Sequence, residues 1–242
     1  MPSACGPLAR LRSRYREVGP ANAALLGLNC LLQSVHPRLA VARYHLMAQP
    51  VPEAPLLRGR ERSLVVRSLR PDDPALARRR PGPDRRPEER RLHEDAYCLG
   101  AFRPGEERLL GFIRLLSGAH REDEHRCLLR PPADPRCVLD VDVYVFPHAR
   151  GGFVFAHLWD AANAWLRRQG VEWTLSRISA FNANSLRAHQ RLGAQRVGDL
   201  YFLQMGALEI LLTGQRPFVA VSRPRGRPPE ITIHPPGPGL QP

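Results

Sequence analysis

The sequence contains no lysine, so all 36 of its Lys and Arg residues are arginine. A Walker-type phosphate loop and a Schiff base to a carbonyl substrate both require a lysine, so both are excluded. With 25 prolines among 242 residues, the arginine excess is typical of a coding bias across a genome. Much of the net charge of +13 is therefore expected to follow from composition rather than from a polyanionic partner.

Cysteine is also scarce, and its spacing excludes two classes of site. The five cysteines are scattered, odd in number and never spaced as Cys-x-x-Cys. This pattern argues against a disulfide scaffold or structural zinc, and it favours a reducing cytoplasm. The nine histidines form no His-x-x-x-His pair that would bind a metal from one helix, so we predict no metal site.

Long hydrophobic runs are absent. The segment 21–35 is apolar but short, and Asn22, Asn29 and Gln33 interrupt it. A membrane-spanning helix needs about 20 apolar residues. We therefore expect no membrane partner and no signal peptide here.

The length and the 43% hydrophobic content predict one good core with appended segments. We divide the chain into an N-terminal helix and strand (1–60), a central domain (61–215) and a Pro/Arg/Gly-rich tail (216–242) that is expected to be disordered. Two uses for residues 1–60 stay open, namely covering a sheet edge and forming a homodimer contact.

The most informative stretch is 138–193, which predicts strand, turn, helix, strand and helix. Residues 138–146 alternate and are rich in β-branched side chains, which indicates a strand that Pro147 ends. A helix follows as far as Gly170, a second strand covers 171–180, and a short helix runs to Gly193. Further strands are predicted at 64–69, 96–102, 109–116, 195–205 and 207–212, and Gly111 indicates a bulge or a close backbone approach.

The turn between the first strand and its helix is a candidate anion site. A glycine turn that leads into a helix directs unpaired backbone N–H groups at its contents, and the helix dipole adds positive charge. Arg150 adds a two-pronged cationic donor suited to phosphate. The alternative is that Gly151 and Gly152 only make a tight turn.

This stretch resembles the cofactor core of the GNAT superfamily of N-acetyltransferases, with a similarity that spans about residues 109–212. The matching residues are Val145-Phe146-Pro147 and Arg150, followed by Asn182, Ser185, His189 and Gly193-Ala194. The resemblance implies an α/β (α+β) fold, with a strongly twisted, mixed and mostly antiparallel sheet flanked by helices on both faces. It also implies transfer of an acyl group, by default acetyl from acetyl-CoA, to an amine-bearing acceptor.

The resemblance also implies residue roles. Cofactor binding would fall to Val145, Arg150, Gly151, Gly152, Phe153, Val154 and Asn182. In this scheme Arg150 and the amides of 151–154 hold the pyrophosphate, the backbone near Val145 polarises the thioester carbonyl, and Asn182 positions the cofactor arm. His189 stands where the family has a tyrosine that protonates the thiolate, and its alternative is an exposed helix residue.

One departure from the family motivates a rival function. The two loop glycines of the family are Phe153 and Phe155 here, and their side chains would crowd the pyrophosphate unless they turn into the core. The rival is a GNAT-like protein that binds a ligand or partner without turnover.

Asp140 and Asp142 are the candidate bases. On a regular strand they share one face with Tyr144, while the valines between them share the other. Two carboxylates on an apolar strand raise the pKa of one of them, which suits a base near neutral pH. Ion pairing with arginine in a buried network is the alternative.

Two charged segments each have a functional interpretation and a purely structural or compositional one. Glu122, Asp123 and Glu124 either attract a cationic amine or balance nearby arginines. Residues 223–228 resemble an AT-hook, an arginine motif that enters narrow A·T minor grooves. Because arginine and proline are over-used throughout the chain, we do not expect a nucleic-acid partner, but a nucleic-acid-binding protein that uses the basic tail stays open as a second rival function.

Overall fold

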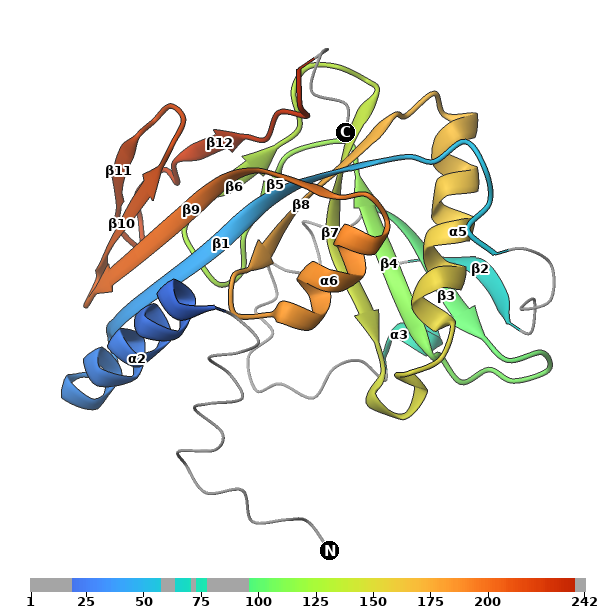
Figure 1. Cartoon of the computed structure of the whole chain (residues 1–242), viewed down its shortest axis with the longest axis horizontal. Helices are drawn as coiled ribbons and strands as arrows, with labels where there is room; N and C mark the ends of the chain where they lie inside the picture. Colours follow the sequence, from blue (N-terminus) through green and yellow to red (C-terminus); the bar gives the residue numbers. More distant parts are fainter. Residues whose placement is uncertain (1–18, 58–63, 71–72, 78–95, 238–242) are drawn as a thin grey trace, which may run out of the picture.

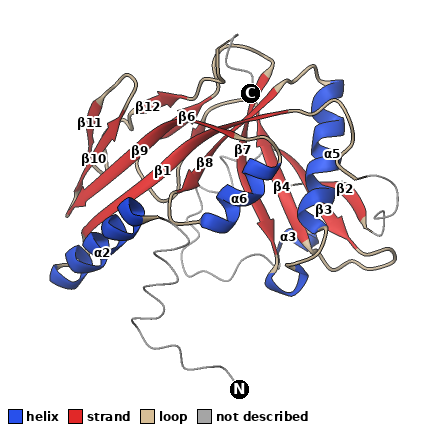
Figure 2. Cartoon of the chain, in the orientation of Figure 1, coloured by secondary structure: helices blue, strands red, loops and turns tan. Residues whose placement is uncertain are grey.

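The computed structural model describes residues 19–57, 64–70, 73–77 and 96–237. They form a nine-stranded sheet in the order β11-β10-β9-β1-β8-β7-β4-β3-β2 and a three-stranded sheet in the order β12-β6-β5 (Figures 1 and 2). Within the large sheet only β7 and β8 pair in parallel, so it is mixed and mostly antiparallel, as predicted.

The strands are β1 (Leu39–Pro50), β2 (Val65–Leu69), β3 (Tyr97–Phe102), β4 (Gly111–Leu116), β5 (His120–Arg121), β6 (Leu128–Arg130), β7 (Cys137–Val145), β8 (Trp173–Ser179), β9 (Gln195–Met205), β10 (Leu208–Thr213), β11 (Val219–Ser222) and β12 (Glu230–Thr232). The helices are α2 (Pro20–Val35), α3 (Pro74–Ala77), the 3-10 turn η1 (Pro147–Ala149), α5 (Val154–Arg168) and α6 (Ala183–Arg191).

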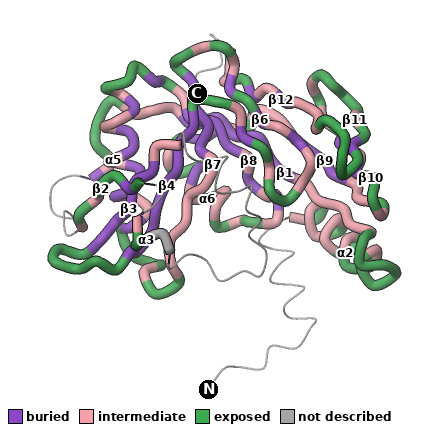
Figure 3. The backbone as a smooth tube through the Cα atoms, turned by 180° about the vertical axis from the view of Figure 1, so that it is seen from behind, coloured by how far each residue is buried: buried purple, intermediate pink, exposed green. Residues whose placement is uncertain are grey.

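Both faces of the large sheet are covered. The helices α2, α5 and α6 lie on one face, and the three-stranded sheet packs against the other (Figure 1). The short helix α3 packs in a third cluster around Phe112. The middle of the sheet is the most deeply buried part of the tube in Figure 3, because apolar side chains leave β7, β8 and β1 in both directions. The predicted α/β class with a mixed, mostly antiparallel sheet is therefore the one observed, but the three-stranded sheet, rather than long helices, covers the second face.

The described part of the N-terminal segment, residues 19–57, is more central than the sequence suggested. β1 is not an edge cover, because it lies between β8 and β9 and pairs antiparallel with both. Its alternation is weak because both of its faces are buried, which hides the two-residue period in the sequence. The helix α2, in contrast, does cover an edge, as one of the two alternatives predicted. It lies along the part of β1 that extends past the end of β8, where Asn29 Oδ1 accepts the Val41 N–H at 2.9 Å.

The prediction of disorder for 216–242 is wrong over much of that range. β11 extends the large sheet, and β12 pairs in parallel with β6. Ile231 and Ile233 are completely buried in the same cluster as Leu139 and Leu175. Composition favoured disorder because proline and arginine dominate the segment, but two isoleucines two residues apart are enough to anchor it in the core. Residues 238–242 lie outside the described part.

Gly111 marks a close approach rather than a bulge of its own strand. A Cβ on Gly111 would meet Tyr144 O at 2.7 Å and Val154 Cγ1 at 3.0 Å. The first turn of α5 therefore sits directly against β4, and this contact fixes the N-terminus of α5 beside the end of β7.

Candidate functional site

The central feature of the site is a fork between β7 and β8. Their parallel pairing covers only Cys137–Leu139 opposite Trp173–Leu175. Beyond this point β7 continues along β4 to Val145, whereas β8 continues along β1 to Ser179. The two strands therefore part on the side where the turn into α5 lies.

The N-terminus of α5 faces this end of β7. Phe153 is the N-cap residue, it makes no side-chain cap hydrogen bond, and the first turn carries no acidic residue. Gly151 has a φ of 80°, a conformation that favours glycine and turns the chain into the helix. The first amides of a 15-residue helix thus have no side-chain acceptor, which is the arrangement that attracts an anion.

Arg150 lies at the same turn and is exposed. Its Nε donates to Val145 O at 3.1 Å, and its guanidinium carbon lies 5.7 Å from the centre of the Tyr144 ring. Because the Val145 carbonyl accepts this bond and Val145 pairs with Gly111, the structure gives Val145 a role in holding Arg150. The polarising role predicted for its backbone stays a prediction.

The two phenylalanines of the turn point different ways. Phe153 is 54% exposed, at the N-cap. Phe155 turns inward, and its ring packs at 5.7 Å from His189 and at 6.3 Å from Trp159, centre to centre. Phe155 therefore does not occupy the turn itself, but it fills space beside the fork.

The strand β7 carries a bulge that separates the two predicted carboxylates. The register with β4 shifts, so that Leu115 pairs with Asp140 and Arg114 pairs with Asp142, which leaves Val141 as the extra residue. Val143 and Val145 then pack with α5, and Tyr144 packs around Phe112. The predicted shared face of Asp140, Asp142 and Tyr144 is therefore wrong, because the bulge breaks the two-residue alternation between Asp140 and Asp142.

Asp140 points to the helical face, where it meets His189. Its Oδ2 lies 3.9 Å from His189 Nε2, and its Oδ1 has no hydrogen-bond partner among the described residues. Burial raises the pKa of Asp140 well above its usual range, and the negative charge of Asp142 raises it further. The predicted upward shift is present, although burial is the larger cause.

His189 is buried, so the interpretation as an exposed helix residue is wrong. It lies on the inner face of α6, and its Nδ1 is 3.1 Å from Gln49 Oε1 of β1. The rings of Phe155 and Trp159 meet it edge to face. Burial lowers the pKa of His189 to about 4, so that the imidazole is neutral at neutral pH.

Two neighbours of this pair had no signal in the sequence. Gln49 is 2% exposed, and its Nε2 has no partner in the described part of the chain. Trp159 Nε1 is equally buried and without a described acceptor. Gln49 was hidden because the three prolines of 49–55 predict a linker there, and Trp159 because its helical spacing identified it only as a core residue.

Asn182 caps α6. Its Oδ1 accepts the Ser185 N–H at 3.2 Å, so this oxygen has a structural role as the N-cap acceptor of α6. The role of Asn182 toward a cofactor arm remains a prediction.

Two residues of the acidic segment 122–124 belong to an ion-pair network on the opposite face of the sheet, the buried Glu122 and the more exposed Glu124. Glu122 and Glu124 both pair with Arg177 of β8, at 3.4 Å for Glu124. The Tyr44 hydroxyl donates to Glu124 Oε2 at 2.7 Å. Burial raises the pKa of Glu122, against the lowering effect of Arg177. For Glu122 and Glu124 the structure therefore favours arginine balancing over amine attraction.

A cavity of about 590 Å³ lies beyond the end of β7. It is lined by Arg67, Asp73, Pro74, Ala75, Glu107, Arg108, Leu109, Phe146 and His148. Because Phe146 is the N-cap of η1 and His148 lies within it, this cavity is next to the turn that carries Arg150.

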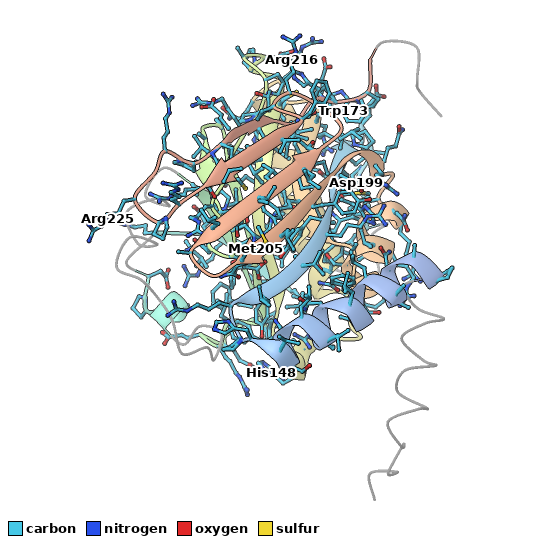
Figure 4. All side chains as sticks on the ribbon, turned by 90° about the vertical axis from the view of Figure 1, so that its left-hand side faces the viewer. His148, Trp173, Asp199, Met205, Arg216 and Arg225 are labelled. Carbon is cyan, nitrogen blue, oxygen red and sulfur yellow. The ribbon has the colours of Figure 1, made fainter. Side chains whose placement is uncertain are left out.

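Residues 223–227 form an exposed loop between two anchored strands. Gly226 N donates to Arg223 O at 2.9 Å, which closes a turn, and Arg225 projects outward (Figure 4). This folded loop differs from the extended segment expected of an AT-hook. No group of three or more potential metal-binding side chains occurs among the described residues. None of the described helices is long and apolar enough to span a membrane.

No family profile matches the chain, and no curated protein is similar to it. Solved structures do resemble it. An acetyltransferase of the GNAT family from Novosphingobium aromaticivorans is 16% identical with a TM-score of 0.43, over 68% of this chain and 64% of that chain.

Two further structures are similar at the same level. A tandem GNAT protein from the clavulanic acid biosynthesis pathway is 16% identical, with a TM-score of 0.45 over 72% of this chain and 56% of that chain. A GCN5-related N-acetyltransferase from Sphaerobacter thermophilus is 14% identical, with a TM-score of 0.44 over 74% of this chain and 54% of that chain. The chain thus spans somewhat more than half of these proteins. At such identities and TM-scores these proteins assign no residue role to this chain.

Proposed function

We propose that the protein is an acyl-CoA-dependent N-acyltransferase that transfers acetyl from acetyl-CoA to an amine-bearing acceptor by direct attack. The observation that carries the proposal is the fork between β7 and β8 beside the uncapped N-terminus of α5. A fork of this kind receives an extended arm, and the helix end receives the anionic part of the same ligand.

The pyrophosphate would lie against the amides of Gly151, Gly152, Phe153 and Val154. Arg150 would add charge, since its exposed guanidinium is held at the turn through Val145 O. The pantetheine arm would enter the fork, with the thioester near the bulge at Val141. The site would thus hold the reacting bond between the two carboxylates of β7.

Asp142 would take the proton from the attacking amine. It lies beyond the bulge, opposite Arg114, while Asp140 points to α6. Replacing a general base typically lowers the rate by about 10²–10⁴-fold. We therefore expect Asp142→Asn to lower kcat by about 10²-fold or more without weakening acetyl-CoA binding.

The experiment that tests the proposal is calorimetric titration of the purified chain with acetyl-CoA. Arg150→Ala is expected to weaken binding by about tenfold, the loss of roughly one charge-assisted hydrogen bond. Arg168→Ala is the matched control, because it removes the same exposed charge at the opposite end of α5. Equal binding by both variants, or no binding by the folded wild type, would reject the proposed pyrophosphate site.

A second candidate is a GNAT-like binding protein without turnover. The packing of Phe155 on His189 favours it, because this ring narrows the space beside the fork. In that case Phe155→Gly, which restores the family's residue, would raise the affinity for acetyl-CoA. If the wild type binds acetyl-CoA and acetylates an amine in a screen, this candidate is eliminated.

A further inference from the structure

The Asp140–His189 pair rests on a third residue that the sequence did not single out. Gln49 Oε1 lies 3.1 Å from His189 Nδ1, and a glutamine oxygen can only accept. The hydrogen of the neutral imidazole therefore sits on Nδ1. Nε2, which faces Asp140, is left as an acceptor.

The surroundings keep this pair out of water. Gln49, Asp140 and His189 all have exposed fractions below one tenth, and aromatic rings of α5 close the side of His189. The groups that face His189 are Gln49 from β1, Asp140 from β7, and Phe155 and Trp159 from α5. Among them Asp140 alone titrates, and Asp142 is the charge that acts on it.

A buried carboxyl beside a ring nitrogen that lacks a hydrogen is stable as the neutral acid. The 3.9 Å between Asp140 Oδ2 and His189 Nε2 is too long for a direct hydrogen bond, so sharing a proton requires a rotation about χ2 of Asp140, a torsion that is soft in aspartate. The raised pKa of Asp140 and the lowered pKa of His189 agree with this assignment, since burial favours the neutral form of each group.

We propose that Gln49 is a positioning residue that holds the hydrogen of His189 on Nδ1, so that Asp140 and His189 Nε2 share one proton at the fork. The catalytic use of this proton rests on the proposed function. There, Asp140 supplies the proton to the departing thiolate of coenzyme A, an S–H bond forms, and Asp140 is left as a carboxylate. The carboxylate regains a proton from solvent before the next turnover.

The tautomer is tested by long-range ¹⁵N–¹H correlation spectra of the histidine side chains at about pH 7, with His189→Gln used for assignment. We expect His189 to show a protonated Nδ1 and an unprotonated Nε2. Gln49→Met, which removes the acceptor at similar volume, is expected to lose this signature. Gln190→Met is the control, because Gln190 is the exposed neighbour of His189 on α6.

Two results would overturn the proposal. One is a hydrogen on Nε2 in the wild type, as expected if the Gln49 amide is turned so that its Nε2 donates to His189. The other is an unchanged His189 signature in a Gln49→Met protein whose amide spectrum is that of the folded wild type.

Kinetics separate this proposal from the proposed function. With an acceptor in hand, Asp140→Asn is expected to lower kcat by about 10²-fold, with KM for acetyl-CoA unchanged within about twofold. If acetyl-CoA does not bind the wild type, the proposed function fails while the tautomer result still decides the role of Gln49. If acetyl-CoA binds and Asp140→Asn keeps full kcat, the proton donor assignment alone is rejected.

Discussion

The guanidinium carbon of Arg177 lies 3.8 Å from the centre of the Tyr44 ring, so a buried cation connects β8 to β1 across the middle of the sheet. The same group pairs with Glu122 and Glu124 from the segment that precedes β6. Arg177 thus links the N-terminal strand, the fork strand and the acidic segment, which are far apart in the sequence.

Removing this cation is expected to destabilise the protein strongly. Arg177→Met leaves Glu122 buried without its partner, and breaking a buried pair in this way costs about 3–5 kcal/mol. Denaturant unfolding measures the loss. The double variant Arg177→Met with Glu122→Gln should recover part of it, because the uncompensated charge is gone. Equal stability of wild type and Arg177→Met would show that the network contributes nothing.

The stability of the protein should depend on the ionisation of Asp140. Its pKa is raised in the folded state by burial and by Asp142, so the unfolded state loses the proton first as the pH rises. The contribution of Asp140 to stability is therefore full below its unfolded pKa and declines as the pH rises through the folded pKa. Asp140→Asn removes this decline, and we expect it to be more stable than the wild type near neutral pH.

Urea unfolding of both proteins between about pH 4 and pH 8 tests this expectation. Asp134→Asn serves as a control of opposite sign, because a hydrogen bond from Arg136 lowers the pKa of Asp134. A carboxyl whose pKa is lowered in the folded state, such as Asp134, stabilises the fold at high pH, and this stabilisation is lost as the pH falls through the folded pKa. If Asp140→Asn has the same pH dependence as the wild type, the carboxyl is ionised in the folded protein.

The contact of Gly111 with α5 should tolerate no side chain. A methyl group at this position meets backbone at 2.7 Å and Val154 at 3.0 Å, so Gly111→Ala must displace the first turn of α5. Overpacking of this kind costs about 1–3 kcal/mol. We also expect weaker acetyl-CoA binding, since that turn carries the proposed pyrophosphate site.

Gly118→Ala is the matched substitution for this test. A Cβ at Gly118 would have no heavy atom within 4 Å. The free energy of unfolding of Gly118→Ala should therefore remain within about 0.5 kcal/mol of the wild-type value. Thermal or denaturant unfolding together with calorimetric titration compares the two variants. Identical behaviour of the Gly111 and Gly118 variants would contradict the close approach.

The C-terminal segment should contribute to global stability. Ile231 is completely buried beside β6, so Ile231→Ala is expected to cost about 2–5 kcal/mol. Val221 in β11 is 60% exposed, and Val221→Ala should change the stability by no more than about 0.5 kcal/mol. A neutral Ile231→Ala variant would support the disorder that composition suggested.

Much of the order of elements around the site could be predicted from the sequence. The strand that ends at Pro147, the helix after Gly152 and the helix capped by Asn182 all have local causes, namely alternation, turn residues and caps. The alternation also brought Asp140 forward as a candidate, because a carboxylate on an apolar strand is conspicuous, whereas His189 became a candidate through the resemblance to the GNAT family. These features depend on neighbours along the chain, and the sequence therefore determined them by itself.

The arrangement of those candidates was decided by tertiary structure. The bulge at Val141 sends Asp140 and Asp142 to different surroundings, and it exists only in the pairing of β7 with β4. Gln49 reaches His189 because β1 enters the middle of the sheet, 140 positions away in sequence. Such contacts follow from which strands become neighbours, and no local pattern specifies that choice. The elements were thus determined by local preference, and the site by long-range pairing and burial.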